Sequence, residues 1–140
     1  MQLVRFLGVF TVSISYALLL TYYGWRGNID KRKTAQYRAY RKILRLWGIN
    51  VRVTGELAKA PALLVANHCS YIDVAILGSL GSMRFTPKSD VQHWFGIGKI
   101  VRAFDVIFIE RSRAQARQTQ ENLLGALRNN DRLCVFPEGT

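Results

Sequence analysis

The sequence predicts an α/β domain in which a mixed sheet flanked by helices follows an amino-terminal membrane helix and a basic amphipathic helix. Three observations support this. Residues 6–25 contain no charged side chain, residues 26–48 are strongly basic, and from Ile49 onward short β-rich runs alternate with longer helical ones. We therefore divide the chain into a membrane segment over 1–25, a basic helix over 26–48 and an α/β domain over 49–140.

The first segment is long enough to cross a bilayer, because a spanning helix needs about 20 apolar residues. Tyr22 and Trp25 stand where an aromatic belt would lie. A cleavable signal peptide fits less well, since the apolar run is too long and no Ala-x-Ala-like site follows it. A shallow hairpin within one leaflet stays open, because Gly8 and several hydroxyl residues weaken the first half as a spanning helix.

The second segment is rich in cations, and the positive-inside rule therefore places the protein at the cytoplasmic face of a membrane, the bacterial inner membrane or its equivalent. Tyr40, Ile43, Leu44 and Trp47 recur at helical spacing. This apolar stripe either lies on an anionic lipid surface or packs on the domain core. The cations are Arg26, Lys31, Arg32, Lys33, Arg38, Arg41, Lys42 and Arg45, opposed by Asp30.

The net charge of +11 would also suit a nucleic-acid-binding protein. The cations, however, directly follow an apolar anchor, and no motif with interleaved aromatic residues appears. We therefore expect anionic lipid as a partner and no nucleic acid. Cys69 and Cys134 are too few and too far apart for a zinc site or a disulfide framework, which indicates a reducing compartment.

The third segment contains four predicted strands and two predicted helices. The strands are Val51–Thr54, Leu63–Ala66, Val106–Ile109 and Leu133–Phe136, and the helices are Tyr71–Leu80 and Arg113–Asn129. The stretch Arg84–Ala103 fits no single pattern. Within it, His93, Trp94 and Lys99 either line a groove for the acyl donor or belong to a packed connector.

The best clue to chemistry is the run from Asn67 to Asp73, which follows a predicted buried strand. Residues five apart cannot face each other on one helix. A helix that begins at Ser70 would instead leave His68 in the preceding loop and Asp73 in the first turn. There the carboxylate can hold one imidazole nitrogen as N–H and leave the other as a general base.

Structural alternatives exist for each of these residues. Ser70 and Asp73 also fit a capping box, in which Asp73 only satisfies backbone donors. A histidine beside a strand end is often a structural residue. A nucleophilic Cys69 paired with His68 fits poorly, because adjacent side chains usually point apart.

Two more polar blocks follow predicted strands. Arg111 offers a planar fork suited to a phosphate, although an arginine there is often a solvated helix-entry residue. In the block that ends the chain, the backbone of Gly139 can approach an anion while Thr140 adds a hydroxyl donor. Glu138 would orient Arg111, Thr140 or a substrate hydroxyl. An ordinary Pro-Glu-Gly turn is the alternative.

Together, the three blocks resemble the glycerolipid acyltransferase family, which includes 1-acylglycerol-3-phosphate acyltransferases. The resemblance rests on His-x4-Asp within Asn67–Asp73, Phe-Ile-x-Arg over Phe108–Arg111 and Phe-Pro-Glu-Gly-Thr over Phe136–Thr140. It covers the chain from about Val51 to the last residue. Because the sequence stops inside the third block, we expect it to be a fragment of a longer enzyme.

The resemblance implies transfer of a fatty acyl group from acyl-CoA or acyl carrier protein to a lysophospholipid, most directly lysophosphatidic acid. It makes His68 the general base and Asp73 its orienting partner, and it implies no metal and no cofactor. The acceptor's phosphate-bearing head would meet Arg111, Glu138 and Gly139. The rest of the substrate-binding set is Asn67, Ser70, Phe108, Pro137 and Thr140.

One position departs from the family pattern, since many relatives carry glycine where Asp105 stands. A carboxylate there would repel a phosphate. Two alternative functions remain. The chain either acylates another lyso-lipid, such as a lyso-aminolipid, or is a non-catalytic membrane-tethered module that binds anionic lipid.

Overall fold

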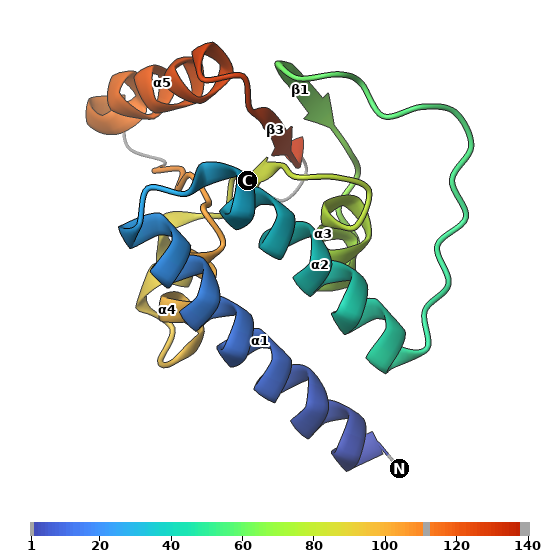
Figure 1. Ribbon diagram of the computed structural model, residues 1–140. Helices are drawn as coiled ribbons and strands as arrows, with labels where there is room; N and C mark the ends of the chain where they lie inside the picture. Colours follow the sequence, from blue (N-terminus) through green and yellow to red (C-terminus); the bar gives the residue numbers. More distant parts are fainter. Residues whose placement is uncertain (1, 111–112, 138–140) are drawn as a thin grey trace. The chain divides into compact units, whose positions relative to one another are not determined.

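The computed structural model describes residues 2–110 and 113–137. The chain separates into two compact units. The first runs to Leu57 and adds Ser70–Ser82, and the second comprises Ala58–Cys69 and the chain from Met83 onward. Figure 1 shows the order of the elements along the chain, and each unit is described by itself below.

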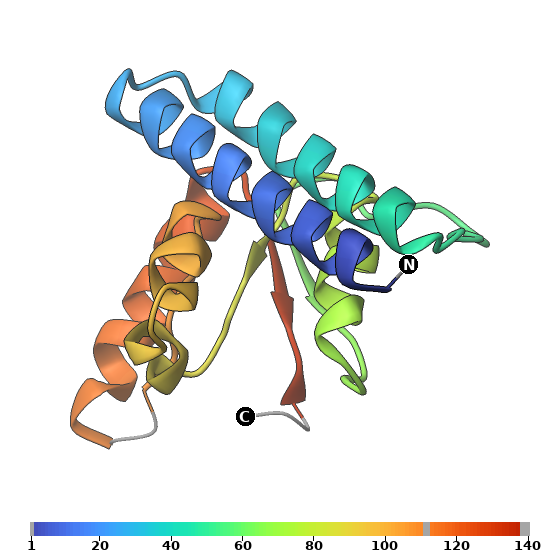
Figure 2. The ribbon, with the colours of Figure 1, turned by 90° about the horizontal axis from the view of Figure 1, so that it is seen from below.

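Two long helices, α1 (Gln2–Trp25) and α2 (Ile29–Trp47), form an antiparallel hairpin in the first unit, and Figure 2 shows them side by side. Asn28 caps α2 by accepting a hydrogen bond from the Lys31 N–H at 3.1 Å. The helices approach closely at both ends. A Cβ atom placed on Gly8 would lie 3.8 Å from Leu46, and one on Gly24 would lie 3.7 Å from Arg32.

The α1 helix satisfies its own polar groups and exposes an apolar side. The hydroxyls of Thr11, Ser13, Ser15 and Thr21 each donate to the carbonyl four residues earlier. Residues Leu3–Trp25 form the one helix in the described part of the chain that is long and apolar enough to cross a membrane. Its exposed apolar stripe consists of Leu3, Val4, Phe6, Leu7, Phe10, Ile14, Leu18, Tyr22 and Trp25.

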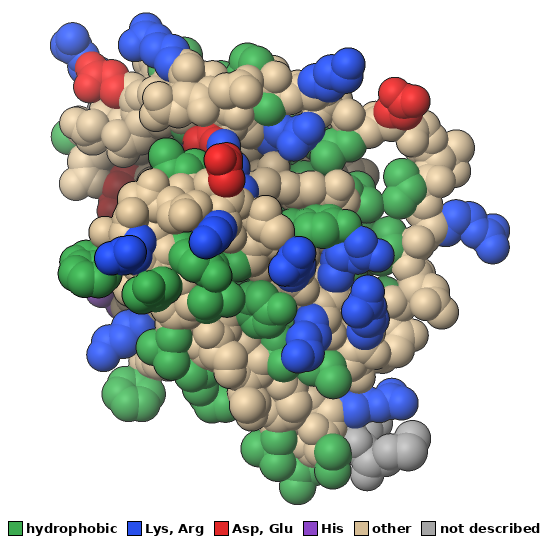
Figure 3. Space-filling model, in the orientation of Figure 1, with side chains coloured by type: hydrophobic (Ala, Val, Ile, Leu, Met, Phe, Trp, Pro, Cys, Tyr) green, Lys and Arg blue, Asp and Glu red, His purple; other side chains and the backbone are tan. Residues whose placement is uncertain are grey.

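The apolar stripe of α2 is buried within the first unit. Tyr40, Ile43 and Leu44 are buried and Trp47 is half-buried. Burial raises the pKa of the Tyr40 phenol above its ordinary value. Of the two interpretations of this stripe, the structure therefore supports packing and not insertion into lipid. Arg32 and Lys33 are half-buried, the other cations of α2 are exposed, and Figure 3 shows Lys and Arg side chains gathered over this helix.

Helix α3 (Tyr71–Gly78) completes the first unit by packing against α2. The contact depends on a missing side chain, because a Cβ atom on Gly78 would lie 2.3 Å from the ring of Tyr40. The predicted helix over 71–80 is therefore confirmed, with its end two residues earlier than expected.

The second unit is built on a three-stranded sheet of β1 (Ala62–Val65), β2 (Arg84–Phe85) and β3 (Arg132–Val135), in the order β1-β3-β2. Both described pairings are parallel, where a mixed sheet was expected. Two of the predicted strands are thus confirmed, each displaced by one residue.

The predicted strand Val106–Ile109 is confirmed in part. These residues form an extended segment that is hydrogen-bonded beside β2 but is not a full strand. The Ile107 N–H donates to the Phe85 carbonyl at 2.9 Å, and the Ile109 N–H donates to the Pro87 carbonyl at 2.9 Å. Helix α5 (Arg113–Arg128) packs Ala126 against Ile107 and Leu133, with Leu123 and Leu127 around them.

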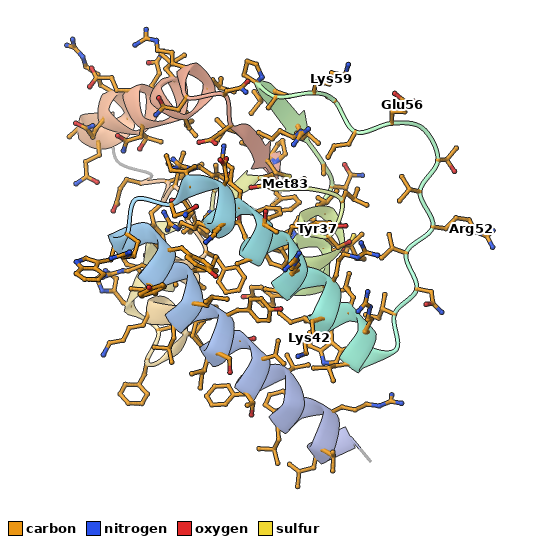
Figure 4. All side chains as sticks on the ribbon, viewed as in Figure 1. Tyr37, Lys42, Arg52, Glu56, Lys59 and Met83 are labelled. Carbon is orange, nitrogen blue, oxygen red and sulfur yellow. The ribbon has the colours of Figure 1, made fainter. Side chains whose placement is uncertain are left out.

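Two regions differ from the sequence-based expectation. Val51–Thr54 forms no strand, because its alternating valines find no partner strand in the described residues. Figure 4 shows Arg52 and Glu56 extending outward from this irregular segment. The unassigned stretch 84–103 contains β2, the short 3-10 helix η1 (Ser89–His93) and helix α4 (Ile97–Ala103).

Candidate active site

His68 lies just beyond the carboxyl end of β1, and Phe136 lies just beyond the carboxyl end of β3. Because these two strands are parallel neighbours, their carboxyl ends meet at one edge of the sheet. The two rings stack there, with centroids 4.3 Å apart and planes 24° apart. The described residues of the first and third sequence blocks therefore share one edge of the sheet.

The stack continues inward from Phe136 to Phe85 of β2, whose ring centroid lies 6.1 Å away with the planes 8° apart. Phe85 and Phe136 are both buried, whereas His68 is half-buried. The Nδ1 atom of His68 is hidden from solvent. One face of the imidazole is thus held by an aromatic ring that is itself fixed in the core.

Asp73 and Ser70 form a capping box at the start of α3. The Ser70 hydroxyl accepts a hydrogen bond from the Ile72 N–H at 3.2 Å, and the Asp73 Oδ2 accepts one from the Ser70 N–H at 2.8 Å. The capping role is therefore confirmed. A carboxylate offers several acceptor sites, so this cap is compatible with a further bond. The orienting role of Asp73 toward His68 remains a prediction.

The other residues of the predicted site are placed as follows. Asn67, Ser70 and Pro137 are exposed, and Phe108 is half-buried in the extended segment beside β2. Arg111, Glu138, Gly139 and Thr140 lie outside the described residues, so their assignment to substrate binding stays a prediction.

The two cysteines differ in their setting. Cys69 is exposed in the loop after His68. Cys134 is buried in β3, and burial raises the pKa of its thiol to about 11, which keeps the thiol protonated near neutral pH. Among the residues that the structure describes, no group of three or more His, Cys, Asp or Glu side chains could hold a metal ion.

An ion cluster at the opposite edge of the sheet was missed by sequence reasoning. Arg84 begins β2, and its Nη2 lies 2.9 Å from the Asp105 Oδ2 while its Nε lies 3.2 Å from the Asp131 Oδ2. Arg84 and Asp131 mark the amino ends of their strands, so the cluster lies away from the edge that carries His68. No local signal predicts it, because the three residues are far apart in the sequence.

This cluster explains the departure at Asp105. Its carboxylate is engaged by Arg84 at the amino edge of the sheet, which removes the expected clash with a phosphate near His68. Asp105 has a φ of 59°, a left-handed conformation that glycine adopts at little cost and aspartate tolerates. The backbone conformation thus accounts for the preference for glycine at this position.

The structure places His68 at the carboxyl edge of a parallel sheet, and comparison with known proteins identifies the family of the chain. The family model described as Acyltransferase matches residues 48–140. The chain belongs to this acyltransferase family, and the resemblance expected from its sequence blocks is confirmed.

Curated relatives fall under two names. A lyso-ornithine lipid O-acyltransferase of Pseudomonas aeruginosa is 37% identical over 90 residues, which cover 64% of this chain and 35% of that protein. One of Brucella abortus is 32% identical over 132 residues, covering 92% of this chain and 47% of the relative. A 1-acyl-sn-glycerol-3-phosphate acyltransferase of Saccharomyces cerevisiae is 34% identical over 122 residues, covering 80% of this chain and 40% of the relative.

The chain therefore spans less than half the length of these relatives. No solved structure matches it significantly.

Proposed function

We propose that the protein is a membrane-bound lyso-lipid O-acyltransferase that moves a fatty acyl group from a thioester donor to a free hydroxyl of its acceptor. The observation that supports this most directly is the position of His68, held by Phe136 at the carboxyl edge of the sheet in a chain of the acyltransferase family. The donor is acyl-CoA or acyl carrier protein.

His68 acts as general base in this proposal. Because Nδ1 is buried, we assign the proton transfer to Nε2. The imidazole takes the hydroxyl proton as the oxygen attacks the thioester carbonyl, an ester C–O bond forms, and the C–S bond breaks. The thiolate then leaves as a thiol with the proton carried by His68. An alcohol is a poor nucleophile near neutral pH, and a positioned base accelerates such a step by about 10²–10⁴-fold.

Asp73 orients the imidazole in this mechanism, in addition to capping α3. One of its oxygens is bonded to the Ser70 N–H, and a second bond from the carboxylate to Nδ1–H would fix the tautomer that leaves Nε2 basic.

For the acceptor, lyso-ornithine lipid is the first candidate and lysophosphatidic acid the second. The relatives from Pseudomonas aeruginosa and Brucella abortus, both named for lyso-ornithine lipid, support the first, and the yeast relative supports the second. Engagement of Asp105 by Arg84 is compatible with both, since it leaves neither head group facing that carboxylate. Arg111, Glu138 and Gly139 are proposed to bind the head group.

We place the hairpin of α1 and α2 flat in one leaflet of the membrane rather than across it. The contacts of Gly8 with Leu46 and of Gly24 with Arg32 keep the two helices together along their length. If α1 spanned the bilayer, the exposed cations of α2 would enter hydrocarbon, at about 2.5–3.5 kcal/mol for each charge at the centre. Lying flat, α1 buries its apolar stripe while the cations of α2 meet lipid head groups at the cytoplasmic face.

The deciding experiment measures thiol release from acyl-CoA and from acyl carrier protein thioester, using membranes that contain the full-length protein. Lyso-ornithine lipid and lysophosphatidic acid are supplied separately as acceptors. We expect release that requires one acceptor and falls at least 10²-fold in His68→Ala.

Absence of thiol release with every pair of donor and acceptor would refute the proposed acyltransferase activity. The non-catalytic alternative would gain if the His68→Ala variant retained lipid association and neither protein released thiol. Neutralising Arg38, Arg41, Lys42 and Arg45 separates the two roles, because it should weaken salt-sensitive association with anionic vesicles and leave the chemistry at His68 in place.

A further inference from the structure

The second unit carries its own exposed apolar surface, at the turn between η1 and α4. Trp94, Phe95 and Ile97 are neighbours in this turn, and the Phe95 side chain is fully exposed, at 103% of its reference area. Trp94, which was expected either to line a donor groove or to belong to a packed connector, is 43% exposed, and the choice between these two roles stays a prediction. Large apolar side chains that are adjacent and exposed are typical of a surface that contacts a protein or a membrane.

The turn is rigidly built, which argues against accidental exposure of a loose loop. The Ile97 N–H donates to the Phe95 carbonyl at 2.8 Å, and the Gly98 N–H donates to the Trp94 carbonyl at 2.9 Å. Gly96 has a φ of 72°, which glycine adopts without strain. A Cβ atom on Gly98 would lie 2.1 Å from the Gln92 carbonyl oxygen, so the turn closes tightly against η1.

The turn lies toward the sheet edge that carries His68. η1 begins shortly after the carboxyl end of β2, and Figure 2 shows the chain continuing beyond that end of β2 before it returns along α4. His68 follows the carboxyl end of β1 in the same parallel sheet. The exposed aromatic residues and the proposed base therefore belong to one side of the second unit.

The charges around the turn favour an anionic lipid surface over an apolar protein partner. Lys99 and Arg102 are exposed on α4, and Arg102 donates to the Gln92 side chain at 3.4 Å, which ties α4 to η1. Trp and Phe prefer the interface between head groups and acyl chains, and Lys and Arg extend from there to phosphates. The one acid of η1, Asp90, leaves the cations in excess.

We infer that the turn from Trp94 to Ile97 is a second membrane contact, inserted at the interface of an anionic phospholipid bilayer. It goes beyond the proposed activity, since it requires no acyl transfer. It holds the edge that carries His68 at the bilayer surface, where a lyso-lipid acceptor resides. The helix α1 attaches the first unit, and this turn attaches the second.

The test uses the full-length protein with Trp94 as its only tryptophan, all others being replaced by Phe, including Trp25 and Trp47. The protein is bound to vesicles of phosphatidylcholine and phosphatidylglycerol in equal parts, with and without bromine near the start of the acyl chains. We expect the emission of Trp94 to shift to shorter wavelength and to lose intensity with the brominated lipid.

Phe95→Ser in the same protein should reduce the quenching. Leu124→Ser is the matched control, because Leu124 is an exposed apolar residue of the second unit on α5 and lies away from the turn in sequence. A sister protein that keeps only Trp25 reports on α1 separately.

Quenching of Trp25 without quenching of Trp94 would overturn the inference and leave membrane attachment by α1 intact. Protection of Trp94 from aqueous acrylamide without quenching by brominated lipid would also overturn it, because the turn would then be covered by protein. Loss of thiol release in any variant bears on the proposed function and not on this contact.

Discussion

The imidazole of His68 stacks on the phenyl ring of Phe136, with ring centroids 4.3 Å apart, and so joins the loop after β1 to the loop after β3. An aromatic stack of this kind contributes about 0.5–1.5 kcal/mol beyond area burial. If the stack positions the proposed base, Phe136→Leu should lower kcat by about 2- to 10-fold while KM changes little.

Phe85→Leu is the control for that variant. Phe85 lies on the inner side of Phe136, at 6.1 Å, and its loss should cost stability without a comparable loss of kcat. Equal effects of the two substitutions on kcat would show that Phe136 serves only the core.

A second prediction separates the two roles of Asp73. Asp73→Asn keeps a side-chain oxygen that can accept from the Ser70 N–H, so the cap should lose no more than about 1 kcal/mol. The carboxylate charge is lost, however, and we expect thiol release to fall by about 10²–10⁴-fold, the usual contribution of general-base catalysis.

Asn28→Ala removes the cap of α2 and is the matched control. It should lower the free energy of unfolding by about 0.5–2 kcal/mol and leave the rate unchanged below the unfolding transition. Full activity of Asp73→Asn would reduce Asp73 to its capping role.

A third prediction concerns the ion cluster of Arg84. Asp131 is almost fully buried, so Arg84→Met removes the cation that pairs with a desolvated carboxylate and should cost at the lower end of about 3–5 kcal/mol, measured by urea unfolding. Arg84→Met combined with Asp131→Asn should recover part of that loss.

Arg117→Met is the comparison, because its ion pair with Glu121 is exposed and should contribute less than about 1 kcal/mol. Similar losses for Arg84→Met and Arg117→Met would refute a structural role for the cluster.

Local patterns predicted the elements whose own residues carry enough information. The uncharged run near the amino terminus predicted α1, and apolar residues at helical spacing predicted α2 and α5. The capping pattern of Ser70 and Asp73 predicted the start of α3. The apolar runs before Asn67 and Phe136 gave β1 and β3, and their parallel pairing follows from the helices between them.

Other features depend on partners that are distant in sequence. The alternation at Val51 and Val53 looks like a strand, yet a strand forms only where another offers its backbone. β2 has two residues and no periodicity, so its place beside β3 is decided by tertiary packing. The sequence pattern predicted that His68 follows one strand and that Phe136 ends another, but it did not predict that their rings stack.

A fourth prediction tests the contact between α3 and α2. Gly78→Ala would bring a Cβ atom to 2.3 Å from the Tyr40 ring, and overpacking of this kind costs about 1–3 kcal/mol. Gly125→Ala is the control, because a Cβ atom there meets no atom within 4 Å and the helix interior should gain about 0.5–1 kcal/mol. Unfolding curves of both variants measure this. A gain in stability for Gly78→Ala would contradict the close approach.

The last prediction concerns the buried thiol of Cys134, whose pKa is raised to about 11 from 9.0 because burial disfavours the thiolate. Below pH 9 the thiol is protonated in both the folded and the unfolded chain, and its contribution to stability is complete. Between pH 9 and 11 the unfolded chain loses this proton first, so the free energy of unfolding falls as the pH rises, by about 1.4 kcal/mol for each pH unit. Cys134→Ala removes this titration, and the difference in stability between parent and variant should therefore shrink over that window, while contributions from other groups cancel. A difference that stays constant from below pH 9 to 11 would show that the thiol titrates as it does in water.

Maleimide labelling gives an independent check, because the folded protein should react at the exposed Cys69 and be protected at Cys134.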